Sequence, residues 1–182
     1  PDSLLGVRDR ALLLLGFAGA MRRSELVGLD LTDLAFGDEG LVVVVGRSKT
    51  DQTGKGRKIG IPFGQHSETC PVRAVQEWID VSGISEGPLF RSVNKHRHVG
   101  DRRLSDKSVA EIVKRSLLAA GKSARSFAGH SLRAGLITQA AMSGVSERAI
   151  QDQSGHKSLS VMRRYIRDGS LFRENAAAKV GL

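Results

Sequence analysis

The chain holds a few residues that could act together on a phosphate ester. His130 and Arg133 stand three positions apart, Tyr165 lies nine residues after His156, and Arg22 lies far upstream. A guanidinium can contact two phosphate oxygens at once, an imidazole can accept a proton, and a tyrosine hydroxyl can act as a nucleophile. Residues of these types could together bind a phosphate and attack it, with Tyr165, the only tyrosine of the chain, as the candidate nucleophile.

Each of these residues taken alone also fits a structural role. Arg22 could simply pair with Glu25 three residues later, and Tyr165 could pack at the edge of an apolar helix stripe. Lys49 lies in a basic loop in which other lysines compete for any role. The spacing of His130 and Arg133 puts both on one helix face, at an N-terminus whose backbone N–H groups favour anions. Only the combination is informative.

The composition bounds the class of protein. The 182 residues suffice for one domain with its own core, which Leu, Val, Ile and Ala must build because aromatic residues make up only 4%. No apolar run approaches the roughly 20 residues that cross a bilayer, so no membrane is expected. Cys70 is the only cysteine, which excludes an internal disulfide and suits a reducing cytosol. Because the chain starts without Met, we expect a piece of a longer protein.

The charge is unevenly distributed along the chain. The formal net charge is +9; residues 1–90 carry 10 Lys and Arg against 12 Asp and Glu, and residues 91–182 carry 18 against 7. A basic half favours a polyanionic partner, because neutralised phosphates release bound counterions. The pattern is typical of nucleic-acid binding, although a merely basic surface would show it too.

The periodicity predicts a mostly helical α+β domain with one small antiparallel sheet. Strands are expected at residues 41–45 and 57–62, joined by a polar, basic loop over residues 46–56. Residues 86–104 are expected to form a long basic connection with a short strand at residues 89–90. Helices are expected at residues 4–17, 24–29, 71–81, 105–120, 131–142, 146–153, 158–166 and 170–179. No internal linker divides the chain.

The ordered set of motifs resembles the tyrosine recombinase (phage integrase) family over nearly the whole chain. The matching pieces are Arg22-x-Ser24-Glu25-Leu26, the hairpin Lys49, His130-x-x-Arg133, Gly155-His156 and Tyr165. Residues 46–50 and 165–167 are especially similar to the Cre recombinase branch. Ala134 follows Arg133 where many integrases carry a His, but the Cre branch lacks that His too, so we expect an active enzyme.

The resemblance implies the family's catalytic domain, with its DNA breaking-rejoining fold, over residues 1–182, and a separate N-terminal core-binding domain outside this chain. It also implies a site-specific recombinase or integrase that works through a 3′-phosphotyrosyl intermediate. The implied catalytic residues are Arg22, Lys49, His130, Arg133, His156 and Tyr165, with Glu25 supporting the site. Further DNA contacts are expected from Arg47, Lys55, Arg163 and Arg164.

In the implied mechanism Tyr165 is the nucleophile and Arg22 and Arg133 hold the phosphate. We expect His130 to be the general base, His156 to hydrogen-bond the phosphate, and Lys49 to protonate the leaving 5′-oxygen. The new ester keeps the energy of the old one, so neither ATP nor a metal is expected as a cofactor. The chain has no GxxxxGK[ST] motif, and His96-x-His98 is interpreted as part of a basic loop.

The expected partners are double-stranded DNA and further copies of the chain. By resemblance we expect a tetramer on paired DNA sites, with the helix after Tyr165 docked in a neighbouring copy, and a monomer without DNA. The expected location is the cytoplasm of a prokaryote, at the nucleoid. Two alternatives stay open: DNA relaxation like that of a type IB topoisomerase, and a non-catalytic basic DNA-binding module.

Overall fold

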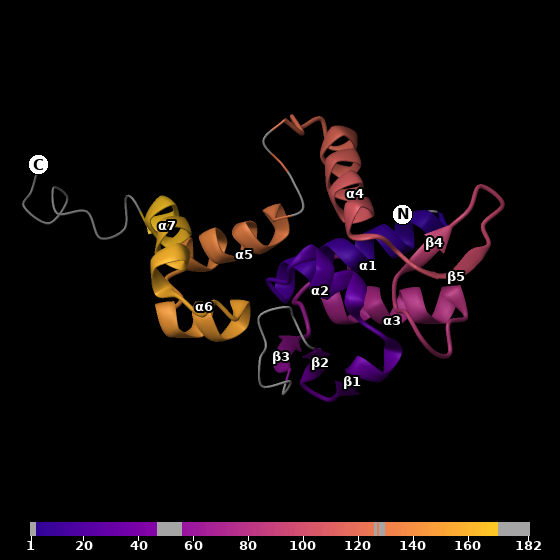
Figure 1. Ribbon diagram of the computed structural model, residues 1–182, viewed down its shortest axis with the longest axis horizontal. Helices are drawn as coiled ribbons and strands as arrows, with labels where there is room; N and C mark the ends of the chain where they lie inside the picture. The colour runs from indigo at the N-terminus through magenta and orange to yellow at the C-terminus, as the bar shows by residue number, and fades with distance from the viewer. Residues whose placement is uncertain (1–2, 47–55, 126, 128–129, 171–182) are drawn as a thin grey trace, which may run out of the picture.

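The computed structural model describes residues 3–46, 56–125, 127 and 130–170. These residues form a mostly helical domain with two small antiparallel sheets (Figure 1). The helices are α1 (Leu4–Ala18), α2 (Arg23–Gly28), α3 (Pro71–Ser82), α4 (Asp106–Ala119), α5 (Ser131–Met142), α6 (Glu147–Ser154) and α7 (Leu159–Ser170). The strands are β1 (Leu34–Gly37), β2 (Gly40–Val45), β3 (Arg57–Pro62), β4 (Arg91–Val93) and β5 (Val99–Arg103). Short 3-10 helices lie at Leu31–Asp33 and Ser67–Thr69.

Hydroxyl caps begin several helices where the sequence predicts them. The Ser3 hydroxyl accepts a hydrogen bond from the Gly6 backbone N–H at 3.1 Å, and Ser105 and Ser146 begin α4 and α6 in the same way. The left-handed Gly83 and Gly155 follow the last residues of α3 and α6. The predicted helix at residues 170–179 lies almost wholly outside the described residues.

The three-stranded sheet has the order β1-β2-β3, with both pairs antiparallel. The predicted pairing of residues 41–45 with 57–62 is confirmed, whereas β1 was not predicted. Leu41, Val43 and Val45 face the core together with Ile59 and Ile61, and all five are at most 4% exposed. This alternation fixes the register, since a slip by one residue would expose the apolar face.

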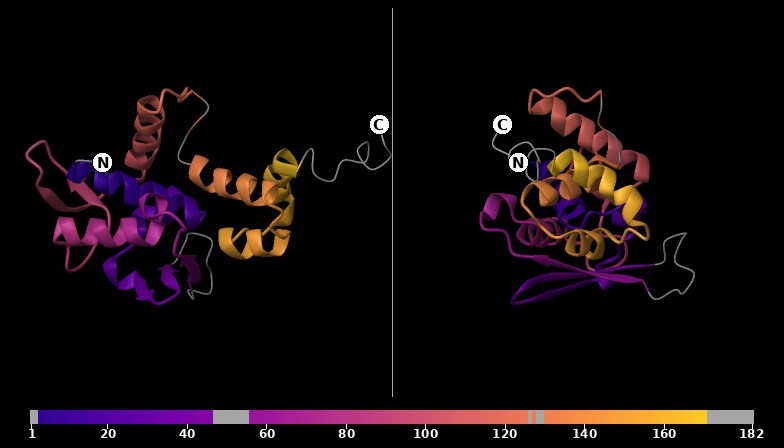
Figure 2. Two further views of the ribbon diagram at one scale, coloured as in Figure 1. Left: turned by 180° about the vertical axis from the view of Figure 1, so that it is seen from behind. Right: turned by 90° about the vertical axis from the view of Figure 1, so that its left-hand side faces the viewer.

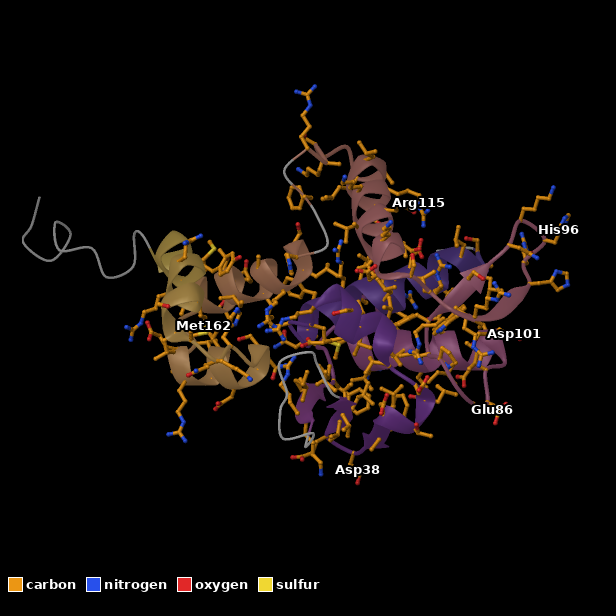
Figure 3. All side chains as sticks on the ribbon, in the orientation of Figure 1. Asp38, Glu86, His96, Asp101, Arg115 and Met162 are labelled. Atoms are coloured by element: carbon orange, nitrogen blue, oxygen red, sulfur yellow. The ribbon has the colours of Figure 1, made fainter. Side chains whose placement is uncertain are left out.

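The prediction of a strand at residues 89–90 is wrong. Leu89 and Phe90 are completely buried core residues, and Leu89 O accepts a hydrogen bond from the Trp78 indole N–H at 2.8 Å. The strands lie just beyond, at β4 and β5, and form a second, two-stranded sheet. Figure 3 shows this hairpin, with His96 and Asp101, projecting from the end of the domain opposite α7.

The side chains pack in two separate apolar clusters. The main core joins α1, α2, α3, α4 and the three-stranded sheet, with Leu12, Leu15 and Trp78 fully buried. A smaller cluster, composed of Ile137, Ala141, Ile150 and Met162, holds α5, α6 and α7 together. Figures 1 and 2 show these three helices side by side at one end of the domain, beyond the end of α1. Among the described residues, no helix is long and apolar enough to cross a bilayer.

Candidate active site

Arg22 and Glu25 are fixed at the beginning of α2. The Glu25 carboxylate accepts a hydrogen bond from the Arg22 backbone N–H at 2.9 Å and a second from the Arg22 guanidinium at 2.5 Å. The first contact satisfies a backbone donor that the helix cannot pair itself. The Glu25 side chain is only 5% exposed, whereas that of Arg22 is 36% exposed. Glu25 therefore orients Arg22 so that its guanidinium still reaches solvent.

Arg133 projects from the first turn of α5 and is 5% exposed. Its Nη1 donates to the backbone carbonyl of Ala20 at 2.7 Å and to that of Ser154 at 2.5 Å. Its Nη2 lies 3.1 Å from Nδ1 and 3.3 Å from Nε2 of His156. The guanidinium thus connects the end of α1, the end of α6 and the His156 ring.

The His156 ring is held from two further sides. The Ser154 hydroxyl, which is fully buried, lies 2.8 Å from Nδ1 of His156. The side-chain amide of Gln151 donates to the His156 backbone carbonyl at 2.9 Å. These contacts fix the loop that follows Gly155, so the ring has little freedom to turn.

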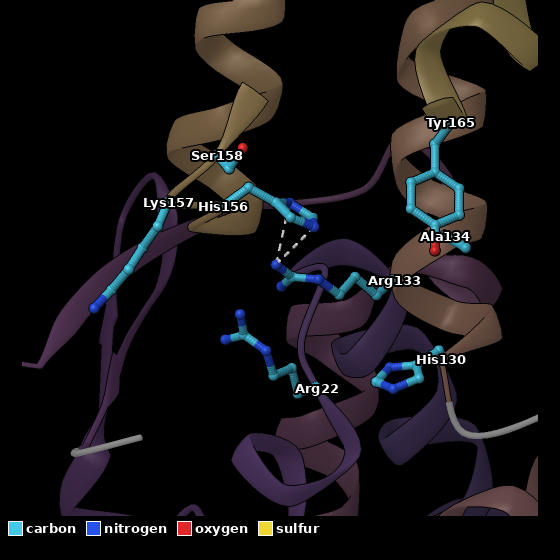
Figure 4. A pocket seen from close by; sticks show the side chains of 8 residues that line it. All are labelled: Arg22, His130, Arg133, Ala134, His156, Lys157, Ser158 and Tyr165. Atoms are coloured by element: carbon cyan, nitrogen blue, oxygen red, sulfur yellow. Dashed lines mark hydrogen bonds between the residues drawn. The ribbon is translucent and has the colours of Figure 1, made fainter. Parts of the chain in front are cut away.

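A cavity of about 370 Å³ opens between α2, α5 and α7 (Figure 4). Its lining residues are Arg22, His130, Arg133, Ala134, His156, Lys157, Ser158 and Tyr165. Figure 4 shows the guanidinium groups of Arg22 and Arg133 on one side and the Tyr165 hydroxyl beside Ala134 on another. His130 comes from the beginning of α5, below Tyr165 in this view. A phosphate between these groups and the His156 ring would meet two guanidinium groups, two imidazoles and the Tyr165 hydroxyl.

The electrostatics of the cavity favour an anion. Burial alone would raise the pKa of the Glu25 carboxyl, but hydrogen bonds from Arg22 and the charge of Arg57 outweigh it and hold this pKa below its ordinary value. Burial, and then the positive charge of Arg22, lower the pKa of Arg133 from 12.5 to about 10. Three guanidinium groups therefore stand close together against the one carboxylate of Glu25, and an incoming anion would relieve their repulsion.

His156 is neutral at pH 7 in this environment. Burial lowers its pKa from 6.5 to about 4, and the nearby charges of Arg133 and Arg22 act in the same direction. A neutral imidazole has one N–H donor and one acceptor nitrogen. His156 can therefore donate a hydrogen bond to a phosphate oxygen without adding a fourth positive charge.

The structure brings five of the six residues predicted to be catalytic to this one cavity: Arg22, His130, Arg133, His156 and Tyr165. Glu25 lies directly behind Arg22 and pairs with its guanidinium. The predicted Lys49, Arg47 and Lys55 lie outside the described residues. Arg163 and Arg164 are exposed on α7, and Arg163 pairs with Glu147 at 3.0 Å.

Sequence reasoning missed Arg57, Gln153 and Ser154. Arg57 donates to Glu25 Oε2 at 3.2 Å and to the Gln153 backbone carbonyl at 2.6 Å. The Gln153 side chain donates to the Ala18 backbone carbonyl at 2.8 Å. Nothing in the local sequence marks Arg57 and Gln153, because the partners of their side chains lie 32 to 135 positions away. Ser154 lies only two residues before His156, and that proximity was the one local signal.

Comparison with known families agrees with this geometry. A model of the Phage integrase family matches residues 2–170 of the chain. The chain belongs to the phage integrase family. It is 45% identical over 175 residues to an integrase/recombinase XerD homolog of Selenomonas ruminantium, covering 96% of this chain and 51% of that protein. It is 30% identical over 173 residues to tyrosine recombinase XerC of Syntrophus aciditrophicus, covering 91% and 50%. The chain thus spans about half the length of these relatives.

Solved structures show the same integrase fold. The site-specific recombinase XerH, in a post-cleavage complex with its difH substrate, matches 98% of this chain and 47% of its own, with a TM-score of 0.72 and 20% identity. The XerA recombinase matches 96% and 55%, with a TM-score of 0.66 and 20% identity. The predicted fold class is therefore confirmed: this is the fold of tyrosine recombinase catalytic domains.

Proposed function

We propose that the chain is the catalytic domain, over residues 1–182, of a site-specific DNA recombinase or integrase that cleaves and rejoins strands through a 3′-phosphotyrosyl intermediate. The observation that carries the proposal is the cavity in which Arg22, Arg133, His156 and His130 surround one side of the Tyr165 hydroxyl. The relatives named XerD and XerC, and the DNA-bound XerH structure, support it. The whole protein would add a DNA-binding domain ahead of this one.

The proposed reaction exchanges one phosphodiester for another. The Tyr165 oxygen forms a bond to phosphorus while the bond from phosphorus to the 5′-oxygen breaks. His130 accepts the proton of Tyr165, and Lys49 gives a proton to the 5′-oxygen, which leaves as a hydroxyl. Strand rejoining runs the same steps in reverse with a different 5′-hydroxyl. The bond energy is conserved, so ATP is not required.

The charge that develops on the phosphate is met by Arg22 and Arg133. Each acts as a donor fixed before the substrate arrives, because Glu25 holds Arg22 and two backbone carbonyls hold Arg133. Donors that need no reorganisation contribute on the order of 10²- to 10³-fold each to the rate. Neutral His156 supplies a further hydrogen bond to a non-bridging oxygen.

The proposed partners are duplex DNA and three further copies of the chain on paired sites. Arg47, Lys55, Arg163 and Arg164 would add phosphate contacts outside the cavity. Residues 171–182, which include Leu171, Phe172 and Val180, would dock on a neighbouring copy. An apolar groove of about 520 Å³ between α1, α5 and α6, lined by Phe17, Leu136 and Val145 among others, suits this segment. A tetramer on paired DNA sites that persists after removal of residues 171–182 would contradict this docking.

The likeness of residues 46–50 and 165–167 to the Cre branch stays a prediction, since the relatives reported above carry XerD and XerC names. The bacterial relatives support a place in the bacterial cytoplasm, and with DNA as substrate the protein would act at the nucleoid.

Covalent capture of DNA tests the proposal. The protein is incubated with a pool of nicked duplexes of randomised sequence, in which cleavage beside the nick releases a short 5′-hydroxyl fragment and traps the adduct. Protein-linked strands are separated on a denaturing gel and sequenced. We expect an adduct on Tyr165 that Tyr165→Phe abolishes, while DNA binding is kept. An adduct formed by Tyr165→Phe would refute the assignment, and relaxation of supercoiled plasmid by the monomer would favour a topoisomerase.

A further inference from the structure

The C-terminal end of α6 is capped by two arginines from other parts of the chain. The last carbonyls of a helix have no partner within it and carry the negative end of the helix dipole. Ser154 O accepts a hydrogen bond from Arg133 at 2.5 Å, and Gln153 O accepts one from Arg57 at 2.6 Å. His156 follows two residues later. Its position therefore depends on both guanidinium groups.

The other end of the Arg57 guanidinium reaches the opposite wall of the site. Nη2 of Arg57 donates to Glu25 Oε2 at 3.2 Å, and the second oxygen of the same carboxylate binds the Arg22 guanidinium. One planar group thus joins the α6 end, which positions His156, to the carboxylate that positions Arg22. A lysine has a single charged nitrogen on a flexible stem and does not reproduce this fork.

The backbone beside His156 is shaped to fit Arg57. Gly155 has φ +64°, and a Cβ added there would lie 2.8 Å from Cδ and Nε of Arg57. The side chain of Arg57 therefore lies directly against the Gly155 α-carbon, where only glycine leaves room. The side chain is 21% exposed, so most of it is covered by these neighbours.

We propose that Arg57 is a positioning residue of the phosphate-binding cavity, which holds Arg22 and His156 at a fixed separation through Glu25 and the end of α6. This inference rests on the proposed function for its effect on the rate, but its structural part does not. Arg57 begins β3, directly after the segment that carries Lys49.

Kinetics on the captured duplex separate positioning from simple charge. Four proteins are compared: wild type, Arg57→Lys, Arg57→Gln and Lys58→Gln, the last removing an equal charge from an exposed neighbour on the same strand. We expect both Arg57 variants to form the adduct on the order of 10²-fold more slowly, since displacement by about 1 Å can have that effect. Their DNA affinity should stay within about threefold of Lys58→Gln. If Arg57→Lys reacts as fast as wild type, or if the rates fall only as binding weakens, the proposal is wrong.

A second measurement needs no DNA. The NMR signals of the His156 ring are followed against pH in isotope-labelled protein. We expect Arg57→Gln to raise the His156 pKa and both Arg57 variants to shift its ring signals, while Lys58→Gln changes neither. Unchanged His156 signals in both Arg57 variants would overturn the proposal. If Arg57→Gln does not fold, the His156 ring signals are compared between wild type and Arg57→Lys, which keeps a positive charge beside Glu25.

The two measurements keep the two proposals apart. A wild-type protein that captures no DNA contradicts the proposed function, yet the His156 signals still decide whether Arg57 positions the site. Adduct formation by wild type together with full activity of Arg57→Lys contradicts the role of Arg57 alone.

Discussion

Replacement of Arg133 by alanine tests the electrostatic design of the cavity most directly. The carbonyls of Ala20 and Ser154 would each lose a donor, and a buried unsatisfied polar group costs about 1–3 kcal/mol. In the opposite direction, the fall in the Arg133 pKa from 12.5 to about 10 corresponds to roughly 3 kcal/mol of unfavourable burial and repulsion that the variant removes. The two carbonyls together cost about 2–6 kcal/mol and the relieved burial offsets roughly 3, so the expected change in the free energy of unfolding lies between a gain of about 1 and a loss of about 3 kcal/mol.

The expected effect on the chemistry is larger than that on stability. Loss of one preorganised donor should slow adduct formation on the order of 10²- to 10³-fold. DNA binding loses one phosphate contact among several, so the affinity should fall by no more than about tenfold and the salt dependence by about one counterion.

Three assays check these numbers for Arg133→Ala. Urea unfolding gives the stability, fluorescence anisotropy over a range of salt gives the affinity, and a denaturing gel gives the single-turnover rate of adduct formation. Arg73→Ala is the control, because Arg73 is exposed on α3 and does not line the cavity. Equal losses of rate and affinity would refute the reasoning, since Arg133 would then only hold the DNA in place.

Three further predictions concern the loop that carries His156. Because the His156 pKa is lowered in the folded state, its full contribution to the free energy of unfolding should be present above about pH 6.5 and should be lost as the pH drops toward 4. An NMR titration of the His156 ring with a midpoint near 6.5, and no loss of stability over this range, would contradict this. Gly155→Ala should destabilise the fold by about 1–3 kcal/mol, through its positive φ and the contact with Arg57. Gly83 has nearly the same φ as Gly155 but open space around it, so Gly83→Ala measures the backbone contribution alone. Equal losses of stability in the two variants would show that the contact with Arg57 contributes nothing. Ser154→Ala should cost about 1 kcal/mol in denaturant unfolding and slow adduct formation without weakening DNA binding, because the hydroxyl next to Nδ1 of His156 is lost; an unchanged rate would show that the ring needs no such partner.

Much of the helical structure could be predicted because its signals are local. Ser3, Ser105 and Ser146 cap helices through hydrogen bonds to residues three positions later, and Gly83 ends α3. The β4–β5 hairpin was missed because its strands are polar and rich in arginine, so they lack the apolar alternation that marks a strand. β1 was missed because it is short and mostly exposed.

The candidate site also contains residues that could be found from the sequence and a residue that could not. Arg22, Glu25, His130, Arg133, His156 and Tyr165 could be found because their order and spacing resemble a known family, and the structure places them around one cavity or directly behind it. Arg57 could not be found, because its significance comes from Glu25 and from the end of α6, which lie far from it in sequence. The predicted role of Lys49 lies outside the described residues and stays a prediction.

The two apolar clusters have a consequence for how the site opens. Arg22 and Glu25 belong to the part of the chain built on the main core, whereas Tyr165 lies on α7 and packs against the smaller cluster, and His156 lies in the loop between α6 and α7. A small cluster unfolds locally at lower cost than a large one, so hydrogen exchange in α6 and α7 should outpace that in α1 and α3. A phosphate bound across the boundary would slow this exchange, because a ligand stabilises the closed form that binds it. The substrate would then act as the cross-link between the two halves of its own binding site.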